Sequence, residues 1–282
     1  MRWRQFLTPV ISLSPEQARN LVAESGTNLT ILDVRQPAEY AEGHIPGAML
    51  MPLADLADGM RQLPAENPLL VYCAIGGRSR IAAQLLAGNG FSKVMNLSGG
   101  FKAWNGATGF GSYDSGLELF PQTLGLEQAI VTAWGLENAL EAFYATQMGQ
   151  AVQGDVADVF GTLAKMESSH KRRLQRQYAD IVDAPIDGTG VEAAMARNLV
   201  EGGLTTEEYL ARAKVDTNDV MEVLQFAMML EAQAMDLYAR AARRADDVET
   251  RAFLDAMTRE EKSHLAQLAT LLDRHLEGES HA

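Results

Sequence analysis

The 282-residue sequence contains one cysteine, which excludes an intrachain disulfide and a zinc site built from several cysteines. It also lacks any run of about 18 apolar residues, the length a helix needs to span a membrane. Basic residues are scarce: 24 Lys+Arg against 37 Asp+Glu give a net charge of −13, which argues against a general nucleic-acid binder. We therefore expect neither a nucleic-acid nor a membrane partner. No signal peptide is indicated, so we expect a cytoplasmic location.

The acidic surplus is unevenly distributed along the chain. Residues 1–108 hold 9 Lys+Arg and 8 Asp+Glu, whereas residues 109–282 hold 15 (24 − 9) and 29 (37 − 8), so the balances are +1 and −14. A segment rich in Gly, Ser and Asn lies at the change, over 105–116. We predict an α/β domain over 1–108, a linker over 109–122 and a helical domain over 123–282.

Short apolar runs in the first domain are typical of buried parallel strands. They lie at 30–34, 69–72 and 94–97, and helical patterns begin near Ser14 and Ser79. Strands that alternate with helices predict βαβ units and a doubly wound parallel sheet with flanking helices.

The single cysteine, Cys73, follows the strand at 69–72 directly and precedes a Gly-containing loop and a helix. Amides of such a loop, together with a helix N-terminus, stabilise an anion, so a thiolate is favoured here. Arg78 lies at the end of the loop, where it can bind an anionic substrate. The alternative is an inert, buried core cysteine. The combination of strand, cysteine, glycine pair, arginine and helix favours the reactive interpretation.

Three blocks of sequence resemble the rhodanese (sulfurtransferase) family over about residues 8–105. They are LDVRQPAEYAEGHIPGAMLMPL at 32–53, VYCAIGGRSRIAAQLLAGNGF at 71–91 and NLSGGFKAW at 96–104. The resemblance implies that Cys73 takes a sulfane sulfur from a donor such as thiosulfate and passes it to a thiol or cyanide-type acceptor. It also implies that Arg78 contacts the substrate and that the loop cradles the persulfide through Ala74, Ile75, Gly76, Gly77 and Ser79. Related cysteine phosphatases have Cys-x5-Arg, whereas Cys73 and Arg78 are spaced Cys-x4-Arg, so phosphatase activity is the weaker alternative.

Four long helical patterns follow the linker, at 124–149, 152–178, 219–244 and 248–275, with a long connection over 179–218. Chemically similar residues recur in them at an offset of 94 positions (231 − 137 and 264 − 170). The pairs are Glu137 and Glu231, Tyr144 and Tyr238, Glu167 and Glu261, and His170 and His264. Two similar helical hairpins are therefore expected to be related by a pseudo-two-fold axis.

One Glu from each of two helices and Glu-x-x-His from each of the other two is the ligand pattern of carboxylate dimetal sites in four-helix bundles. Bridging carboxylates offset the repulsion between two cations, and one imidazole completes each metal's ligands. We predict as ligands Glu137, Glu167, His170, Glu231, Glu261 and His264. Tyr144 and Tyr238 are candidates to orient the carboxylates by hydrogen bonds. A single Glu-x-x-His would more often be a solvated helix face, but two symmetric copies favour the metal site.

These hairpin motifs resemble the rubrerythrin branch of the ferritin-like superfamily over about residues 123–276. The resemblance implies two irons, with manganese as the alternative, and redox chemistry on oxygen, peroxide or sulfur species. Rubrerythrins with peroxidase activity typically have a further carboxylate where Ala234 lies here, and a four-cysteine electron-transfer domain that this chain cannot form. The electrons are therefore expected to come from an external donor or from the rhodanese domain. By resemblance a homodimer is expected.

We predict a sulfurtransferase fused to a diiron redox domain. The alternative is a non-enzymatic iron storage or sensing bundle, joined to a rhodanese module that carries persulfide or docks a partner. Lys171, Arg172 and Arg173 are interpreted as a solvated face, and Glu141 and Glu260 as surface charges.

Overall fold

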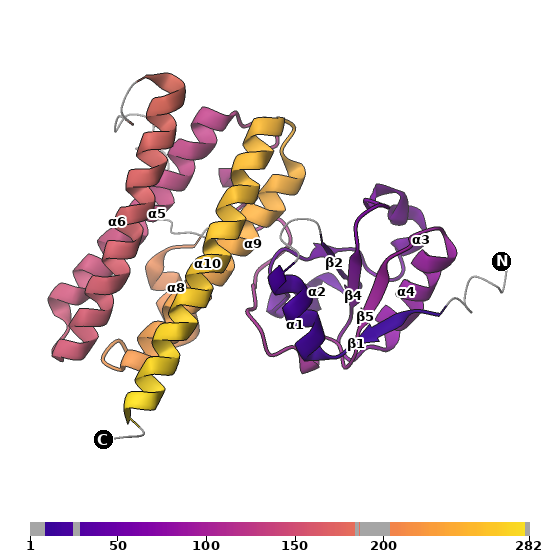
Figure 1. Cartoon of the computed structure of the whole chain (residues 1–282), viewed down its shortest axis with the longest axis horizontal. Coiled ribbons are helices and arrows are strands. Elements are labelled where there is room, and N and C mark those ends of the chain that lie inside the picture. The colour runs from indigo at the N-terminus through magenta and orange to yellow at the C-terminus, as the bar shows by residue number, and fades with distance from the viewer. Residues whose placement is uncertain (1–8, 25–28, 184–185, 187–203, 280–282) are drawn as a thin grey trace. The chain divides into compact units, whose positions relative to one another are not determined.

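The structure is a computed structural model of the chain, and it describes residues 9–24, 29–183, 186 and 204–279 (Figure 1). Contacts divide the chain into two compact units, Met1–Tyr113 and Asp114–Ala282. In the described residues the first unit contains a parallel sheet with helices and the second contains helices.

A parallel sheet of five strands forms the framework of the first unit within its described residues, in the order β1-β5-β4-β2-β3. The strands are β1 (Ile11–Leu13), β2 (Thr30–Asp33), β3 (Met49–Leu50), β4 (Leu69–Tyr72) and β5 (Val94–Leu97). The predicted strands at 30–34, 69–72 and 94–97 are confirmed as the three central ones. The two edge strands, β1 and β3, are too short to show a period in the sequence.

Helices cover both faces of this sheet, namely α1 (Pro15–Glu24), α2 (Pro37–Glu42), α3 (Leu56–Gly59) and α4 (Gly77–Gly88) (Figure 1). Successive side chains of a strand point to opposite faces. Leu69 and Val71 accordingly lie in the cluster that contains buried residues of α3 and α4. Leu70 and Tyr72 lie in the cluster that contains those of α1 and α2. The expected doubly wound arrangement is confirmed.

The segment between the units divides its contacts between them. Gly109 forms an antiparallel bridge with His44 of the first unit. Further along, the Ser115 carbonyl accepts a 2.8 Å hydrogen bond from Arg240 of the second unit. The predicted linker over 109–122 thus consists of two stretches, each packed against its own unit.

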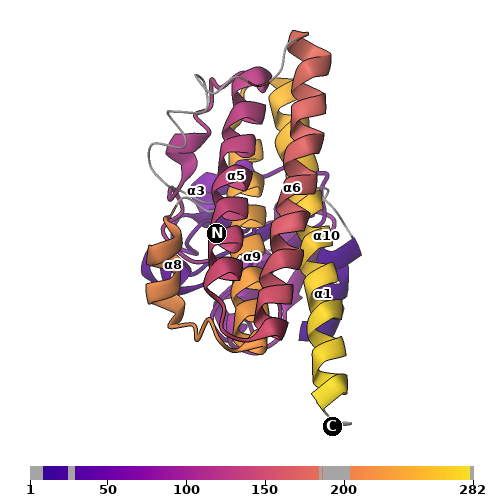
Figure 2. The ribbon, with the colours of Figure 1, turned by 90° about the vertical axis from the view of Figure 1, so that its left-hand side faces the viewer.

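Four long helices form the body of the second unit: α5 (Leu126–Gln150), α6 (Gly154–Val182), α9 (Val220–Arg244) and α10 (Val248–Glu279). The helix α5 packs mainly against α6, and α9 packs mainly against α10 (Figure 2). Each begins and ends within four residues of its predicted bounds. A shorter helix, α8 (Thr206–Ala213), lies in the predicted connection, of which 184–185 and 187–203 fall outside the described residues.

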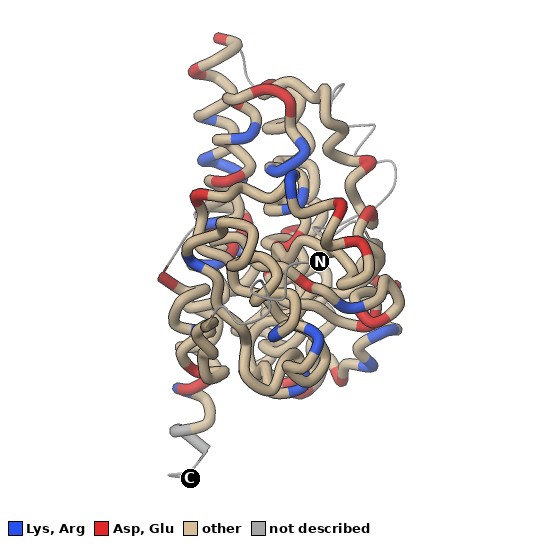
Figure 3. The backbone as a smooth tube through the Cα atoms, turned by 90° about the vertical axis from the view of Figure 1, so that its right-hand side faces the viewer, with Lys and Arg blue, Asp and Glu red and all other residues tan. Residues whose placement is uncertain are grey.

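Acidic and basic residues are interspersed along the chain (Figure 3). Some of the acidic residues of the second unit form ion pairs, as Glu141 does with Lys171 and Asp114 with Arg244. Within the described residues, no helix is both long and apolar enough to cross a membrane.

Candidate functional site

Cys73 lies where the parallel sheet ends and the loop to α4 begins, at the edge where open α/β sheets bind ligands. Its side chain is buried, and the Gly76 amide donates a 3.1 Å hydrogen bond to the sulfur Sγ. Gly76 has φ +93°, a left-handed conformation that turns the loop into the helix. The sequence-predicted loop therefore brings backbone donors to the sulfur.

A neighbouring glycine turn fixes the position of this loop. The Phe101 amide donates a 2.7 Å hydrogen bond to the Cys73 carbonyl, and the Lys102 amide donates to Ala74. A Cβ atom on Gly100 would lie 2.2 Å from the Cys73 carbonyl oxygen. Only a glycine permits this approach, which explains why the block at 96–104 belongs to the site.

The pKa of Cys73 is lowered. Burial of the sulfur opposes ionisation, but hydrogen bonds from Ser79 and from the amides of Ile75 and Gly76 outweigh it. The Ser79 hydroxyl lies 3.4 Å from Sγ and 2.6 Å from Oδ1 of Asn96, so Asn96 holds the serine beside the sulfur. These contacts favour the thiolate, which is the nucleophilic form.

Arg78, predicted to bind an anionic substrate, is paired with Glu39 of α2. Its Nη1 and Nη2 atoms donate hydrogen bonds of 2.8 and 2.6 Å to the two carboxylate oxygens. The hydrogen bonds from Arg78 lower the pKa of Glu39 to about 2. Glu39 is a residue that the sequence analysis missed. Its position three residues after Gln36 is explained by a helix cap, so the sequence carried no separate signal.

A second arginine–carboxylate pair has a different setting. Arg35 donates to both oxygens of Asp33, with a shortest distance of 2.7 Å, and also to the Gly43 carbonyl. The two side chains are 5% and 0% exposed, whereas Arg78 and Glu39 are 37% and 32% exposed. The buried pair joins β2 to the turn after α2, and the exposed pair borders the reactive loop.

The six predicted metal ligands meet in two groups. In each group one atom from every residue lies within 4.8 Å of one atom from the others. Both groups contain two glutamates and one histidine: Glu137, Glu167 and His170 in α5 and α6, and Glu231, Glu261 and His264 in α9 and α10. Each hairpin of the repeat therefore supplies one group.

The two histidines bring the groups side by side. The His170 and His264 rings stack with their centroids 3.8 Å apart and their planes 6° apart. His170 Nδ1 lies 3.1 Å from Glu167, and His264 Nδ1 lies 2.8 Å from Glu261. The arrangement agrees with the pseudo-two-fold relation that the sequence repeat predicts.

Burying several ionised carboxylates together is energetically unfavourable unless positive charge compensates them. The four glutamates are at most 2% exposed, and the Glu137 carboxylate lies 3.5 Å from Nδ1 of His170. Burial alone would raise the pKa of Glu137, but hydrogen bonding to His170, together with the charge of that histidine, outweighs burial and lowers the pKa. Conversely, burial would lower the pKa of His170, but Glu137 raises it. Hard, buried oxygen ligands with one imidazole per group fit a pair of divalent or trivalent cations.

Tyr144 and Tyr238 are fully buried in the same helices. The Tyr144 ring contacts Phe160 at 6.3 Å between centroids, and the Tyr238 ring meets Phe120 edge-on at 5.6 Å. Their suggested role in orienting the carboxylates stays a prediction.

Charged residues beside the ligands correct one interpretation. Lys171, expected on a solvated face, is 16% exposed and donates 2.5 Å hydrogen bonds to Asn138 and Glu141, so it clasps α6 to α5. Arg173 pairs with Glu260 of α10. Lys171 and Arg173 therefore form ion pairs between α6 and the helix that each of them faces. Arg172 alone matches the expectation of an exposed residue.

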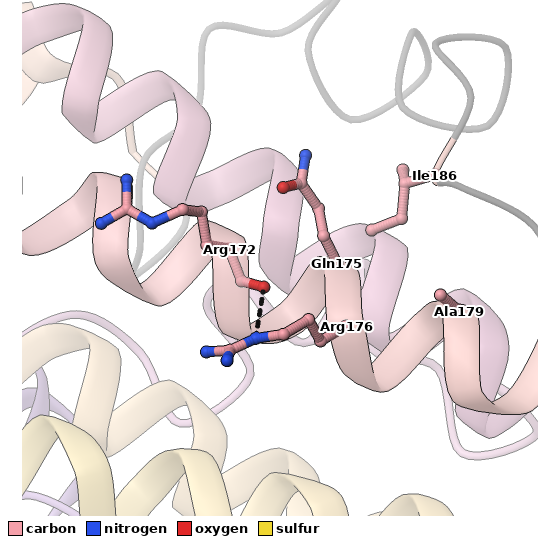
Figure 4. Close-up of a pocket in the computed structure, with 5 residues that line it drawn as sticks. All are labelled: Arg172, Gln175, Arg176, Ala179 and Ile186. Carbon is pink, nitrogen blue, oxygen red and sulfur yellow. Dashed lines mark hydrogen bonds between the residues drawn. The ribbon is translucent and has the colours of Figure 1, made fainter.

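A depression on the surface of α6 contains none of the six ligands in its lining (Figure 4). It is bordered by Arg172, Gln175, Arg176, Ala179 and Ile186. Arg176 Nε donates a 3.3 Å hydrogen bond to the Arg172 carbonyl at the border of the depression (Figure 4).

The fold and the loop define the first unit as a cysteine-centred α/β domain with an anion-stabilising loop after a central strand. Residues 14–107 match the family model Rhodanese, described as a rhodanese-like domain, and the chain belongs to this family through that segment. The helical unit lies outside the matched residues.

Relatives of known name align with the same segment. Thiosulfate sulfurtransferase GlpE of Pseudomonas entomophila is 42% identical over 92 residues, which are 33% of this chain and 82% of that protein. The same-named protein of Pseudomonas putida strain F1 is 39% identical over 92 residues, with the same coverage. A crystal structure of a rhodanese-like domain protein from Staphylococcus aureus is 30% identical, covers 36% of this chain and 100% of its own, and has a TM-score of 0.34.

Proposed function

We propose that this chain is a sulfurtransferase that moves sulfane sulfur from a donor such as thiosulfate to a thiol or cyanide-type acceptor through a persulfide on Cys73. One observation carries the proposal: hydrogen-bond donors surround the buried sulfur of Cys73 at the end of a strand and lower the pKa of its thiol. The names of the relatives, thiosulfate sulfurtransferase, support the reaction class.

In the first half-reaction the Cys73 thiolate attacks the outer sulfur of thiosulfate. A sulfur–sulfur bond forms to Cys73, the bond to the sulfonyl sulfur breaks, and sulfite leaves with the electron pair. The loop amides and Ser79 then stabilise the terminal persulfide sulfur. In the second half-reaction the acceptor attacks that sulfur, and the Cys73 thiolate is restored as the leaving group.

Purified protein should convert thiosulfate and cyanide to sulfite and thiocyanate. Cys73→Ala removes the nucleophile, so the rate should fall to that of the uncatalysed mixture. Mass spectrometry of protein treated with thiosulfate alone should show one added sulfur atom at Cys73. An unchanged rate in the alanine variant would refute the assignment.

We further propose that the helical unit is a rubrerythrin-like, ferritin-like four-helix bundle that binds two iron ions, with manganese as the alternative. Glu137, Glu167 and His170 would hold one ion, and Glu231, Glu261 and His264 the other. The four glutamate carboxylates, all at most 2% exposed and accompanied by only two imidazoles, support this assignment because cations would compensate their charge.

Bound iron would supply redox chemistry on oxygen, peroxide or sulfur species. The protein side chains supply binding: four carboxylates offset the charge of two cations, and the stacked histidines keep both groups at one centre. Within the chain Cys73 is the single cysteine, so electrons would come from an external donor. By resemblance to the ferritin-like superfamily, we propose that the protein acts as a homodimer.

Metal analysis of the full chain after expression with excess iron should give about two metals per chain. Glu137→Gln and Glu231→Gln, at equivalent positions of the repeat, should each lower that content. Asp158→Asn is a matched control, because Asp158 is an exposed acid on α6. Wild-type protein that remains metal-free would refute the proposal for this unit without affecting that for Cys73.

A further inference from the structure

Both carboxylate oxygens of Glu39 accept hydrogen bonds from the guanidinium of Arg78. The two donor–acceptor distances, 2.6 and 2.8 Å, belong to a fork-to-fork pair that uses the same donors a sulfonate group would need. The pair is about one-third exposed, so an incoming substrate reaches it. It therefore belongs to the rim of the site and not to the buried framework.

The carboxylate is fixed and charged. Glu39 Oε2 also accepts a 3.1 Å hydrogen bond from the Gln36 amide at the start of α2, which anchors the side chain independently of Arg78. Because Arg78 lowers the pKa of Glu39 to about 2, the carboxylate is ionised at neutral pH and the pair has no net charge there.

The electrostatic consequence concerns the sulfur donor. A dianion such as thiosulfate gains little from an arginine that is already neutralised, and it meets the Glu39 carboxylate at close range. A donor of low charge meets no such cost. The loop also presents Ile75, which is 71% exposed, as an apolar contact for an organic substituent.

We propose that Glu39 is a specificity-determining residue, which disfavours dianionic sulfane donors and favours organic persulfides of low charge at Cys73. This inference rests on the proposed sulfurtransferase function and names its substrate class. In the favoured step the Cys73 thiolate attacks the outer sulfur of R–S–SH. A persulfide forms on Cys73, the sulfur–sulfur bond of the donor breaks, and the thiol R–SH leaves with the proton.

The test compares Glu39→Gln with wild type for two donors, the dianion thiosulfate and an alkyl persulfide whose alkyl group carries no charge. We expect KM for thiosulfate to fall by about tenfold, equivalent to about 1.4 kcal/mol. KM for the alkyl persulfide should stay within about twofold, because the substitution removes one negative charge and a donor of low charge is little affected by it. In an Arg78→Gln background the same substitution should give a smaller gain, because the repulsion by the carboxylate is removed but no freed guanidinium is available to bind the dianion.

Glu42→Gln is the matched control, since Glu42 is an exposed acid of the same helix and its loss changes the net charge equally. Equal changes for both donors, or an unchanged KM for thiosulfate in Glu39→Gln, would overturn the inference. Calorimetry of thiosulfate binding to Cys73→Ser, with and without Glu39→Gln, separates it from the proposed function. Tighter binding in the double variant supports the inference even if wild type transfers no sulfur, and equal binding refutes it.

Discussion

His170 and His264 are 94 positions apart in the chain, yet their rings stack 3.8 Å apart at an angle of 6°. Each follows a glutamate by three residues on its helix, so the stack joins the two hairpins at chemically equivalent points. The sequence repeat is thereby realised as one centre with four buried carboxylates, and several measurements can test what that centre does.

Removal of either stacked imidazole should reduce metal binding. We expect His170→Ala and His264→Ala each to lower the metal content by about half or more, because each group contains one nitrogen ligand. His275→Ala provides the control, since His275 lies on α10 outside both groups. Metal content by mass spectrometry of the intact proteins decides the matter, and equal content in all three variants would contradict the ligand assignment.

Metal should also stabilise the helical unit. Buried carboxylates lose compensating charge when a cation is removed, so the chelated protein should unfold at a lower temperature than the loaded protein. Binding at about a hundredfold excess over Kd contributes about 2.7 kcal/mol. In Glu137→Gln the difference between chelated and loaded protein should shrink, whereas in Asp158→Asn it should match wild type. Circular dichroism at a helix wavelength gives both melting curves.

The lowered pKa of the Cys73 thiol should be measurable from the pH dependence of its alkylation. Because the folded protein lowers the pKa of Cys73, the alkylation rate should reach half its maximum at a lower pH than it does for an unperturbed thiol. Ser79→Ala removes a hydrogen bond to the sulfur and should move this midpoint upward. Ser92→Ala, at an exposed position after α4, should leave it in place. An unchanged pH midpoint in Ser79→Ala would show that the loop amides alone stabilise the thiolate.

Candidate functional residues within one helix or loop could be predicted from the sequence, whereas side-chain contacts between different elements could not. Cys73 and the six candidate ligands stand out in the sequence because each lies in a local pattern of fixed spacing. The Glu39–Arg78 pair was not, because its members are 39 positions apart and each has a local explanation. Lys171 was misread for the same reason: a basic run on a helix gives no indication that the facing helix offers Asn138 and Glu141.

The close approach of Gly100 to the reactive loop gives a steric prediction. In Gly100→Ala the new Cβ would lie 2.2 Å from the Cys73 carbonyl oxygen, so the loop must move and sulfur transfer should be lost. Gly90→Ala is an informative control, because Gly90 also has a positive φ, +101°, but a Cβ there meets nothing within 4 Å. It should cost about 1 kcal/mol through backbone strain and retain the activity. Similar activity in both variants would mean that the glycine turn does not position the loop.

The two halves of the repeat differ in what surrounds their ligands, which leads to a prediction about access. Lys171 clasps α6 to α5, whereas Leu265 stands at the equivalent position of the other hairpin (171 + 94). The His170 side chain is 15% exposed and that of His264 is 8% exposed, so the polar clasp lies beside the more accessible group. Lys171→Met should therefore speed metal loss to a chelator, because the clasp is removed, and Leu265→Met should change it little. Stopped-flow absorbance with a coloured chelator measures both rates, and equal rates in the two variants would show that the clasp does not guard the site.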